Sequence, residues 1–176
     1  YGIYWYFLDK NVKDDSIERR KFEEKRRENI LDTVQPGYGQ YENDELHAME
    51  DNGSVGATAN GTTRHASSGG RFTYHMKAEK GKDLILEMHL LREDNGKPLI
   101  VTIGDEEIFN KKLHYTGKNA EYVEEIPLPA KLIEKHIEVR KTKEGKVSTV
   151  PLSFRGGMFV ESARLFGFLY LLKKYK

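Results

Sequence analysis

The side chains best suited to bind a ligand gather in one polar stretch, Gln35 to Met76, which is rich in Gly, Ser, Thr and Asn. Aromatic rings offer flat apolar faces with polar tips, and ionised side chains add directed, bidentate hydrogen bonds. These are the groups expected to hold the faces and hydroxyls of a sugar. The candidates outside clear core positions are Tyr38, Tyr41, Glu42, Arg64, His65 and Tyr115. The alternative is that they are ordinary loop residues of a domain that packs on a partner. Five other aromatic residues are assigned to the core or to packing between domains: Trp5, Phe72, Tyr74, Phe166 and Phe168.

The residue types needed for catalysis are present, but not in catalytic patterns. Glycoside hydrolysis uses two carboxyl groups roughly 5–9.5 Å apart, and no pair stands out among the 28 acidic residues. Glu42, Asp44 and Glu45 are clustered, but acids clustered in a turn are usually solvated. The six histidines form no H-x-x-x-H or H-E-x-x-H pair, and the chain has no cysteine for thiolate catalysis or a Cys-based zinc site. We therefore expect no enzymatic activity from this chain.

The length and charge of the chain limit the number of domains and the kinds of partner. The 176 residues suffice for one domain with a small extra segment. Lys and Arg number 29 against 28 acids, so no net field attracts nucleic acid. The apolar runs are too short to span a bilayer. We expect neither nucleic acid nor membrane as a partner. The start, without Met or a signal-peptide pattern, indicates a piece of a longer protein.

Short segments with strand-like patterns, separated by Gly-rich and acidic turns, follow Arg71 and predict β-strands. The expected strands are 71–78, 83–91, 98–103, 107–109, 113–115, 122–126, 137–140, 150–154 and 163–172. Pro127 to Ile133 is expected to cross the surface. Turns this frequent predict an all-β antiparallel sandwich of the jelly-roll type.

The first residues differ from the rest of the chain. Ile3 to Leu8 is aromatic and has strong β propensity, which predicts that residues 1–13 are a strand remnant of a preceding β domain. Asp14 to Ser16 offers a helix cap before a run of mixed charge, so residues 14–33 are expected to form a charged linker helix. The sandwich domain would then span residues 34–176.

Several short motifs occur along the chain in an order and spacing that match a known family. It comprises Pro36-Gly37, Gln40-x-Glu42, His47, Gly53-Ser54, Arg64-His65-Ala66, Gly69-Gly70 and Phe72-Thr73-Tyr74, followed by Gly104 to Ile108, Ile126 to Pro129, Ile137 to Arg140 and Ala163 to Gly167. Together they resemble the C-terminal β-sandwich domain of glycoside hydrolase family 127, the β-L-arabinofuranosidase family. Tyr1 to Phe7 is similar to the strand before the linker helix in those proteins. The resemblance covers nearly the whole chain.

The resemblance implies a role beside an enzyme. In that family the catalytic machinery lies in an N-terminal (α/α) barrel with a cysteine nucleophile at a zinc site. This chain has no cysteine and no room for a barrel. By the resemblance it is a non-catalytic C-terminal accessory domain of a periplasmic or extracellular glycosidase. Its partners would be the barrel of the parent protein and a plant-type glycan.

The position of Glu42 ahead of a Gly/Ser/Thr-rich loop is also similar to β-sandwich carbohydrate-binding modules. This likeness implies the main alternative, an autonomous carbohydrate-binding module, and a structural calcium held by Glu42, Asp44 and Asp51. No other cofactor is expected. A protein-interaction sandwich is the second alternative. An exposed aromatic platform would favour sugar binding, whereas a large apolar patch along Ile3 to Leu8 would favour packing between domains.

Overall fold

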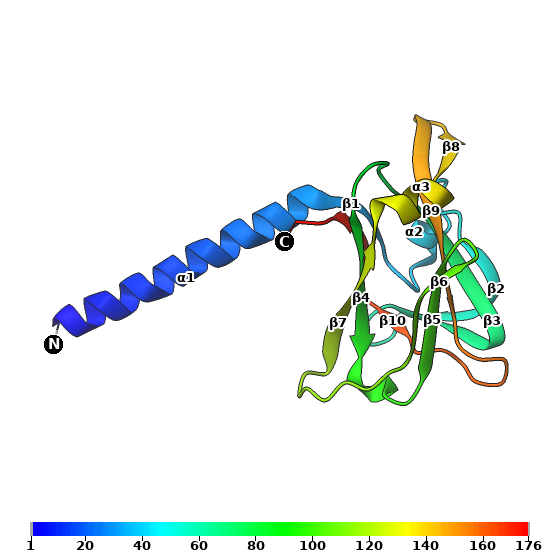
Figure 1. The fold of residues 1–176 in the computed structure, drawn as a ribbon. Coiled ribbons are helices and arrows are strands. Elements are labelled where there is room, and N and C mark those ends of the chain that lie inside the picture. Colours follow the sequence, from blue (N-terminus) through cyan, green and yellow to red (C-terminus); the bar gives the residue numbers. More distant parts are fainter. Residues whose placement is uncertain (1, 176) are drawn as a thin grey trace.

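The computed structural model describes the backbone of residues 2–175 and the side chains of residues 15–175. A long helix, α1 (Gly2–Asn29), runs outward from a sandwich of two β-sheets, and the C-terminal end of the chain lies near the base of this helix (Figure 1). All the strand pairs in both sheets are antiparallel. The all-β antiparallel sandwich predicted from the sequence is therefore confirmed.

α1 replaces two predicted elements. The expected strand at Ile3 to Leu8 is wrong, because these residues are the first turns of a continuous helix. The helix predicted for residues 14–33 ends at Asn29, where a strand of the sandwich begins. No Gly or Pro interrupts residues 3–35, and a helix satisfies its backbone hydrogen bonds locally, whereas a strand needs a partner. The side chains of the predicted apolar patch lie outside the described residues.

The smaller sheet has four strands in the order β1-β11-β4-β7. Their bounds are β1 (Ile30–Val34), β4 (Leu84–Leu91), β7 (Glu121–Leu128) and β11 (Leu169–Lys173). β1 and β7 are thus its two edges. Arg26, near the end of α1, forms an ion pair with Glu87 of β4 and lies over the ring of Tyr170 of β11, 4.8 Å from its centroid. These contacts attach the base of the helix to the outer face of this sheet.

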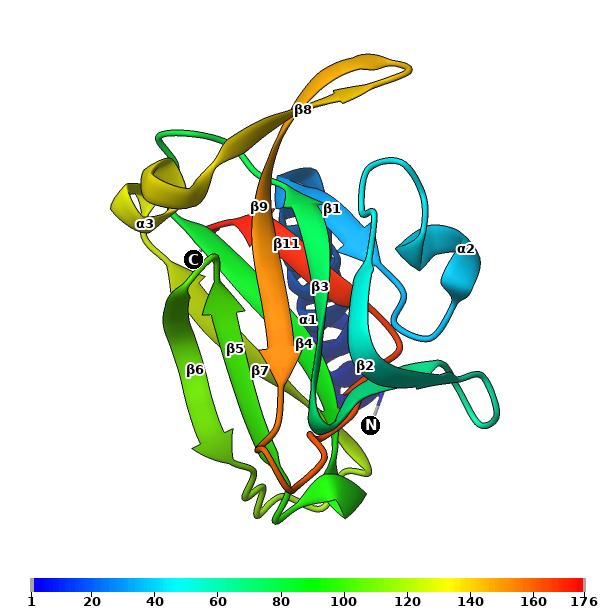
Figure 2. The same ribbon diagram turned by 90° about the vertical axis from the view of Figure 1, so that its right-hand side faces the viewer.

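The larger sheet has seven strands, with β10-β3-β9-β5-β6 as its main order, β2 beside β3 and β8 beside β9. Their bounds are β2 (Glu50–Ala57), β3 (Thr63–Lys77), β5 (Pro98–Ile103), β6 (Glu106–Lys112), β8 (Glu138–Thr142), β9 (Gly145–Arg155) and β10 (Leu165–Phe166). Figure 2 looks onto this sheet, with β11, β4 and β7 crossing behind it. Three short helices connect strands: α2 (Gly39–Glu42), η1 (Arg92–Asp94) and α3 (Ala130–His136).

The core lies between the two sheets and is filled by alternate residues of facing strands. Its largest fully buried side chains include Phe72, Tyr74, Met76, Leu84, Leu86, Met88, Leu90, Leu99, Ile103, Leu128 and Phe154. Phe72 stacks on Phe154 of the neighbouring strand with ring centroids 5.2 Å apart. Phe72 and Tyr74, assigned to the core or to packing between domains, lie in the core.

The strand predictions fail mainly where the chain changes sheet. Residues 163–172 were expected to be one strand, but Gly167, with a φ of +68°, separates β10 in one sheet from β11 in the other. Residues 113–115 form no strand. β1 and β2 were not predicted, because β1 follows directly on a charged helix and β2 is Gly-rich and mostly exposed.

Candidate functional site

The turn that follows β1 places two tyrosines side by side. The N–H of Tyr38 donates to the carbonyl of Gln35 at 3.0 Å, which closes the turn. Gly37 within it has a φ of +89°, and a Cβ at this position would overlap the carbonyl oxygen of Thr63. Glycine is therefore required there. α2 begins immediately afterwards, and the rings of Tyr38 and Tyr41 stack with their centroids 5.0 Å apart.

α2 is anchored to the sandwich by a buried carboxylate. Glu42 is 0% exposed and accepts two hydrogen bonds from Arg64, from Nε at 2.6 Å and from Nη2 at 2.9 Å. The hydroxyl of Tyr74 donates to the same carboxylate. The remaining arm of Arg64 donates to Ser54 Oγ at 2.7 Å, and Ser54 in turn donates to Asp51. A bidentate pair of this kind fixes both position and orientation.

His47 holds the far side of the same segment. Its Nδ1 lies 2.9 Å from the Tyr41 carbonyl oxygen and 3.0 Å from Asp44, and its Nε2 lies 2.9 Å from Asp32 of β1. Burial lowers the pKa of His47, but the hydrogen bond to Asp32 and the charges of Asp32 and Asp44 outweigh burial and raise the pKa to about 9. The imidazole is therefore protonated at neutral pH, and both nitrogens donate. The backbone of Tyr41 is thus tied to β1 through an ion pair.

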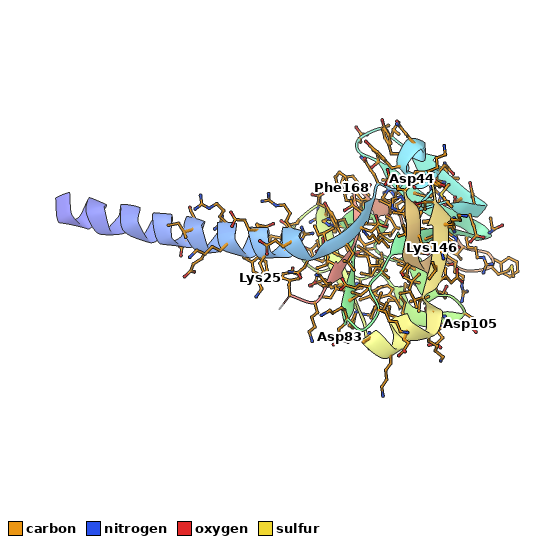
Figure 3. All side chains as sticks on the ribbon, turned by 90° about the horizontal axis from the view of Figure 1, so that it is seen from above. Lys25, Asp44, Asp83, Asp105, Lys146 and Phe168 are labelled. Atoms are coloured by element: carbon orange, nitrogen blue, oxygen red, sulfur yellow. The ribbon has the colours of Figure 1, made fainter. Side chains whose placement is uncertain are left out.

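Beside this segment is an open cavity of about 390 Å³, which we call the aromatic hollow. It is lined by Thr33, Gln35, Tyr41 and Phe168. The pairing of Val34 with Leu169 creates it, because the next residues outward, Gln35 and Phe168, then face each other across the end of β1 and β11. Tyr41 and Phe168 remain 51% and 44% exposed. Figure 3 shows Phe168 on the side of the sandwich reached by β1.

The aromatic hollow combines two exposed ring systems with hydrogen-bonding groups. Phe168 and Tyr41 supply apolar faces, while the amide of Gln35 and the hydroxyl of Thr33 can each donate and accept. Ligand sites have this composition, mainly apolar with a few polar groups that fix orientation. A sugar has matching chemistry, since one face of the ring presents C–H groups and its rim presents hydroxyls.

The six predicted sugar-binding residues fall into separate places. Tyr41 lines the aromatic hollow, and Tyr38 stacks on Tyr41 without lining the hollow itself. Glu42 and Arg64 come together, but as the buried ion pair beneath it, so their placement outside the core is wrong. His65 lies on β3, where its Nε2 is 3.2 Å from Glu161. Tyr115 lies in the loop between β6 and β7, at the edge of the sandwich opposite β1.

The three predicted calcium ligands do not meet. Glu42 is used by Arg64, Asp44 holds His47, and Asp51 accepts from Ser54. Within the described part of the chain, the one group of three or more candidate metal ligands consists of Asp105, Glu106 and His136. Lys135 pairs with Glu106 there, so a side-chain cation already supplies positive charge at this cluster.

Sequence reasoning missed three of the four residues that line the aromatic hollow. Phe168 was assigned to the core or to packing between domains, and its exposed fraction of 44% places it outside the core. A local signal existed, since Gly167 directly before it interrupts an otherwise continuous apolar strand. Thr33 was expected to be the last residue of the linker helix, and Gln35 opened the polar stretch but was not singled out as a binding residue.

No helix among residues 2–175 is long and apolar enough to cross a membrane. No curated protein matches the sequence.

Known structures with a similar fold include a family 6 carbohydrate-binding module from Cellvibrio mixtus lichenase 5A, determined with cellotriose. It shares 13% identity at a TM-score of 0.46, over 82% of this chain and 98% of that one. A family 35 carbohydrate-binding module from Clostridium thermocellum shares 9% identity at a TM-score of 0.48, over 80% and 97% of the two chains. The family 35 module from Paenibacillus barcinonensis shares 8% identity at a TM-score of 0.49, over 79% and 97%.

A sequence family covers the junction of α1 with the sandwich and most of the sandwich itself. The match extends over residues 26–152, which is well over half of the chain, and it includes α2, both anchoring partners of Glu42 and the protonated His47. The chain therefore belongs to the DUF6805 family, a family of unknown function.

Proposed function

We propose that this chain is a non-catalytic carbohydrate-binding β-sandwich module that holds a neutral glycan in the aromatic hollow. The observation that supports it best is the pair of exposed rings, Tyr41 and Phe168, on either side of a cavity of about 390 Å³ that also presents the Gln35 amide. Two large rings left half exposed at one cavity match the composition of a ligand site better than that of a core.

The anchoring of α2 supports the same proposal. Glu42 fixes the helix from below and His47 fixes the Tyr41 backbone from the side. A platform held in this way loses little conformational freedom when a ligand arrives, so more of the contact free energy appears as affinity. Ring stacking between Tyr38 and Tyr41 restrains the platform further.

The experiment is calorimetric titration of the whole chain with arabino-oligosaccharides and pectic side-chain fragments. We expect saturable binding that weakens by about tenfold or more in Tyr41→Ala and in Phe168→Ala, the size of effect typical of an aromatic anchor. Phe159→Ala is the matched control, because this ring is 90% exposed on a different loop. Equal loss in the control, or no heat with any neutral glycan at millimolar concentration, would refute the proposal.

Catalysis is tested separately. We expect the purified chain to release no sugar from arabinosides. The non-catalytic assignment would be overturned if free arabinose appeared in proportion to the amount of chain. A series of variants that changed this rate would exclude a contaminating enzyme.

A second candidate function is that of an accessory domain docked on a catalytic (α/α) barrel, in a periplasmic or extracellular parent protein of the family 127 type. An exposed apolar tip favours it: Met158, Phe159 and Val160 project from the β9–β10 loop with exposed fractions of 72%, 90% and 51%. The loop is braced at its base, where the N–H of Gly157 donates to Val160 and the N–H of Gly69 donates to Gly157, both at 2.9 Å. Exposed apolar clusters of this kind mark contact surfaces.

Docking would be measured by sedimentation of the chain with a purified barrel domain of a family 127 enzyme. We expect a complex that is weakened by Phe159→Ser and unchanged by Val139→Ser, an exposed apolar residue on β8. Absence of a complex at high micromolar concentration would leave the aromatic hollow as the functional surface.

A further inference from the structure

A second hollow lies at the opposite edge of the sandwich, where β6 of one sheet and β7 of the other run along the same side (Figure 2). Its volume is about 250 Å³. We call it the tyrosine pocket, after Tyr115 and Tyr122, which line it together with Lys111, Lys112, His114 and Glu124. The aromatic hollow lies at β1, so the two sites share no residue.

The tyrosine pocket is built on a fixed aromatic pair. The rings of Tyr115 and Tyr122 lie face to face, 4.1 Å apart and within 4° of parallel. Asn95 holds the backbone of Tyr115 from both sides: it accepts from its N–H and donates to its carbonyl, each at 2.9 Å. A Cβ at Gly117 would overlap the Tyr115 hydroxyl, so the loop packs directly against this ring.

One residue that lines this pocket carries an unsatisfied polar atom. The hydroxyl of Tyr122 is buried and has no hydrogen-bond partner in the described part of the chain. Burial, together with the charge of Glu124, raises the pKa of Tyr122. The hydroxyl therefore keeps its proton and remains available as a donor. Buried polar groups are normally paired, so the unpaired hydroxyl of a residue that lines the pocket is a donor still lacking an acceptor.

The charges around the pocket favour an anion. Lys111 and Lys112 both line it, and among residues 15–175 neither has an ion-pair partner. The ammonium of Lys111 lies over the ring of Phe109, 5.2 Å from its centroid. Glu124 is the one acid in the lining, so the fixed charges leave a net positive pocket, and Glu124 can accept from ligand hydroxyls.

We propose that the tyrosine pocket binds a carboxylate-bearing sugar, a hexuronate unit of an acidic glycan. The carboxylate lies between Lys111 and Lys112, the ring hydroxyls reach Glu124 and the Tyr122 hydroxyl, and the cavity accommodates one sugar unit. A simple inorganic anion would use the lysines but neither the aromatic pair nor Glu124. The choice of a sugar rests on the proposed glycan-binding function, although the site itself is separate.

The test is titration of the whole chain with galacturonate and glucuronate, followed by amide NMR shifts, with galactose and inorganic phosphate as separate arms. We expect both uronates to shift residues of the β6–β7 loop, and added salt to weaken binding. Lys111→Gln with Lys112→Gln should reduce affinity by about tenfold. Tyr122→Phe, which removes only the unpaired hydroxyl, should reduce it several-fold while the melting temperature stays unchanged or rises.

The matched control is Lys141→Gln with Lys146→Gln, a cross-strand lysine pair on the β8–β9 hairpin that gives the same change in net charge. Equal weakening in this control, or phosphate binding as tight as uronate binding, would overturn the proposal. Uronate binding that survives Tyr41→Ala separates this site from the aromatic hollow. If neutral glycans fail to bind but uronates bind and respond to the pocket variants, the tyrosine pocket stands and the hollow does not. If neutral glycans bind but uronates do not, the aromatic hollow stands and the tyrosine pocket does not.

Discussion

Substitution of Glu42 by Gln isolates the buried ion pair that anchors α2. The carboxylate accepts two hydrogen bonds from Arg64 and one from Tyr74. An amide of the same shape keeps one oxygen but turns an NH₂ group toward a guanidinium N–H. Arg64 then stays in place, 8% exposed, with its charge uncompensated.

The cost follows from this geometry. Removing one partner of a buried pair typically costs about 3–5 kcal/mol, because the other charge remains buried. Since Arg64 keeps a little contact with water and Ser54, we expect the lower end, about 3 kcal/mol of unfolding free energy. For a chain of this size each kcal/mol lowers the melting temperature by roughly 2–4 °C, so a decrease of about 6–12 °C should follow.

The assay is urea unfolding by circular dichroism with linear extrapolation. Glu121→Gln, an exposed acid on β7, is the control and should stay within about 0.5 kcal/mol of the parent chain. Adding Arg64→Met to Glu42→Gln should recover part of the loss, because no charge is then left buried. A loss below about 1 kcal/mol for Glu42→Gln would refute the conclusion that this pair anchors α2.

Three further predictions concern the same region. The folded-state pKa of His47 is raised from 6.5 to about 9, so its ion pair with Asp32 stabilises fully below pH 6.5 and is lost as pH rises through 9. Unfolding free energy should therefore decrease between these pH values by up to about 3 kcal/mol, and His47→Gln should flatten the profile. Gly37→Ala should destabilise by roughly 2 kcal/mol or more in thermal melts, because of its positive φ and the overlap with Thr63. Since the predicted calcium carboxylates are dispersed, EDTA and excess calcium should both leave the melting temperature unchanged in scanning calorimetry; an increase with calcium would contradict this.

The sandwich was predictable because its core strands carry a strict local pattern. In β4, residues 84, 86, 88 and 90 are all large and apolar, and all are buried on one face. The turn at Gly104 likewise marked the β5–β6 hairpin. α1 was not predictable in its first half, because aromatic residues accept either backbone and their β preference depends on a partner strand. Among residues 2–175 no strand pairs with Ile3 to Leu8, which lie in α1.

The candidate site was only half predictable, because it depends on contacts distant in sequence. Tyr38 and Tyr41 were found from residue type and loop position alone. Phe168 lies beside them only because β11 pairs with β1, a register between residues more than a hundred positions apart. Local composition encodes no such register. In the sequence, Gly167 marks the point where the chain changes sheet, but it does not indicate that β11 will pair with β1.

The pairing of Glu42 with Arg64 changes how variants of this protein must be interpreted. Both have side chains that could bind a sugar directly, and on that view loss of binding in Arg64→Ala would locate the site. In the structure Arg64 reaches Glu42 and Ser54 rather than the aromatic hollow, so the same variant would weaken binding by releasing α2 and displacing Tyr41. The two explanations differ in stability: a direct ligand contact can be removed at little cost in melting temperature, whereas the anchor cannot. Comparing binding and melting temperature in Arg64→Ala and Tyr41→Ala therefore separates the anchor from the surface that touches the glycan.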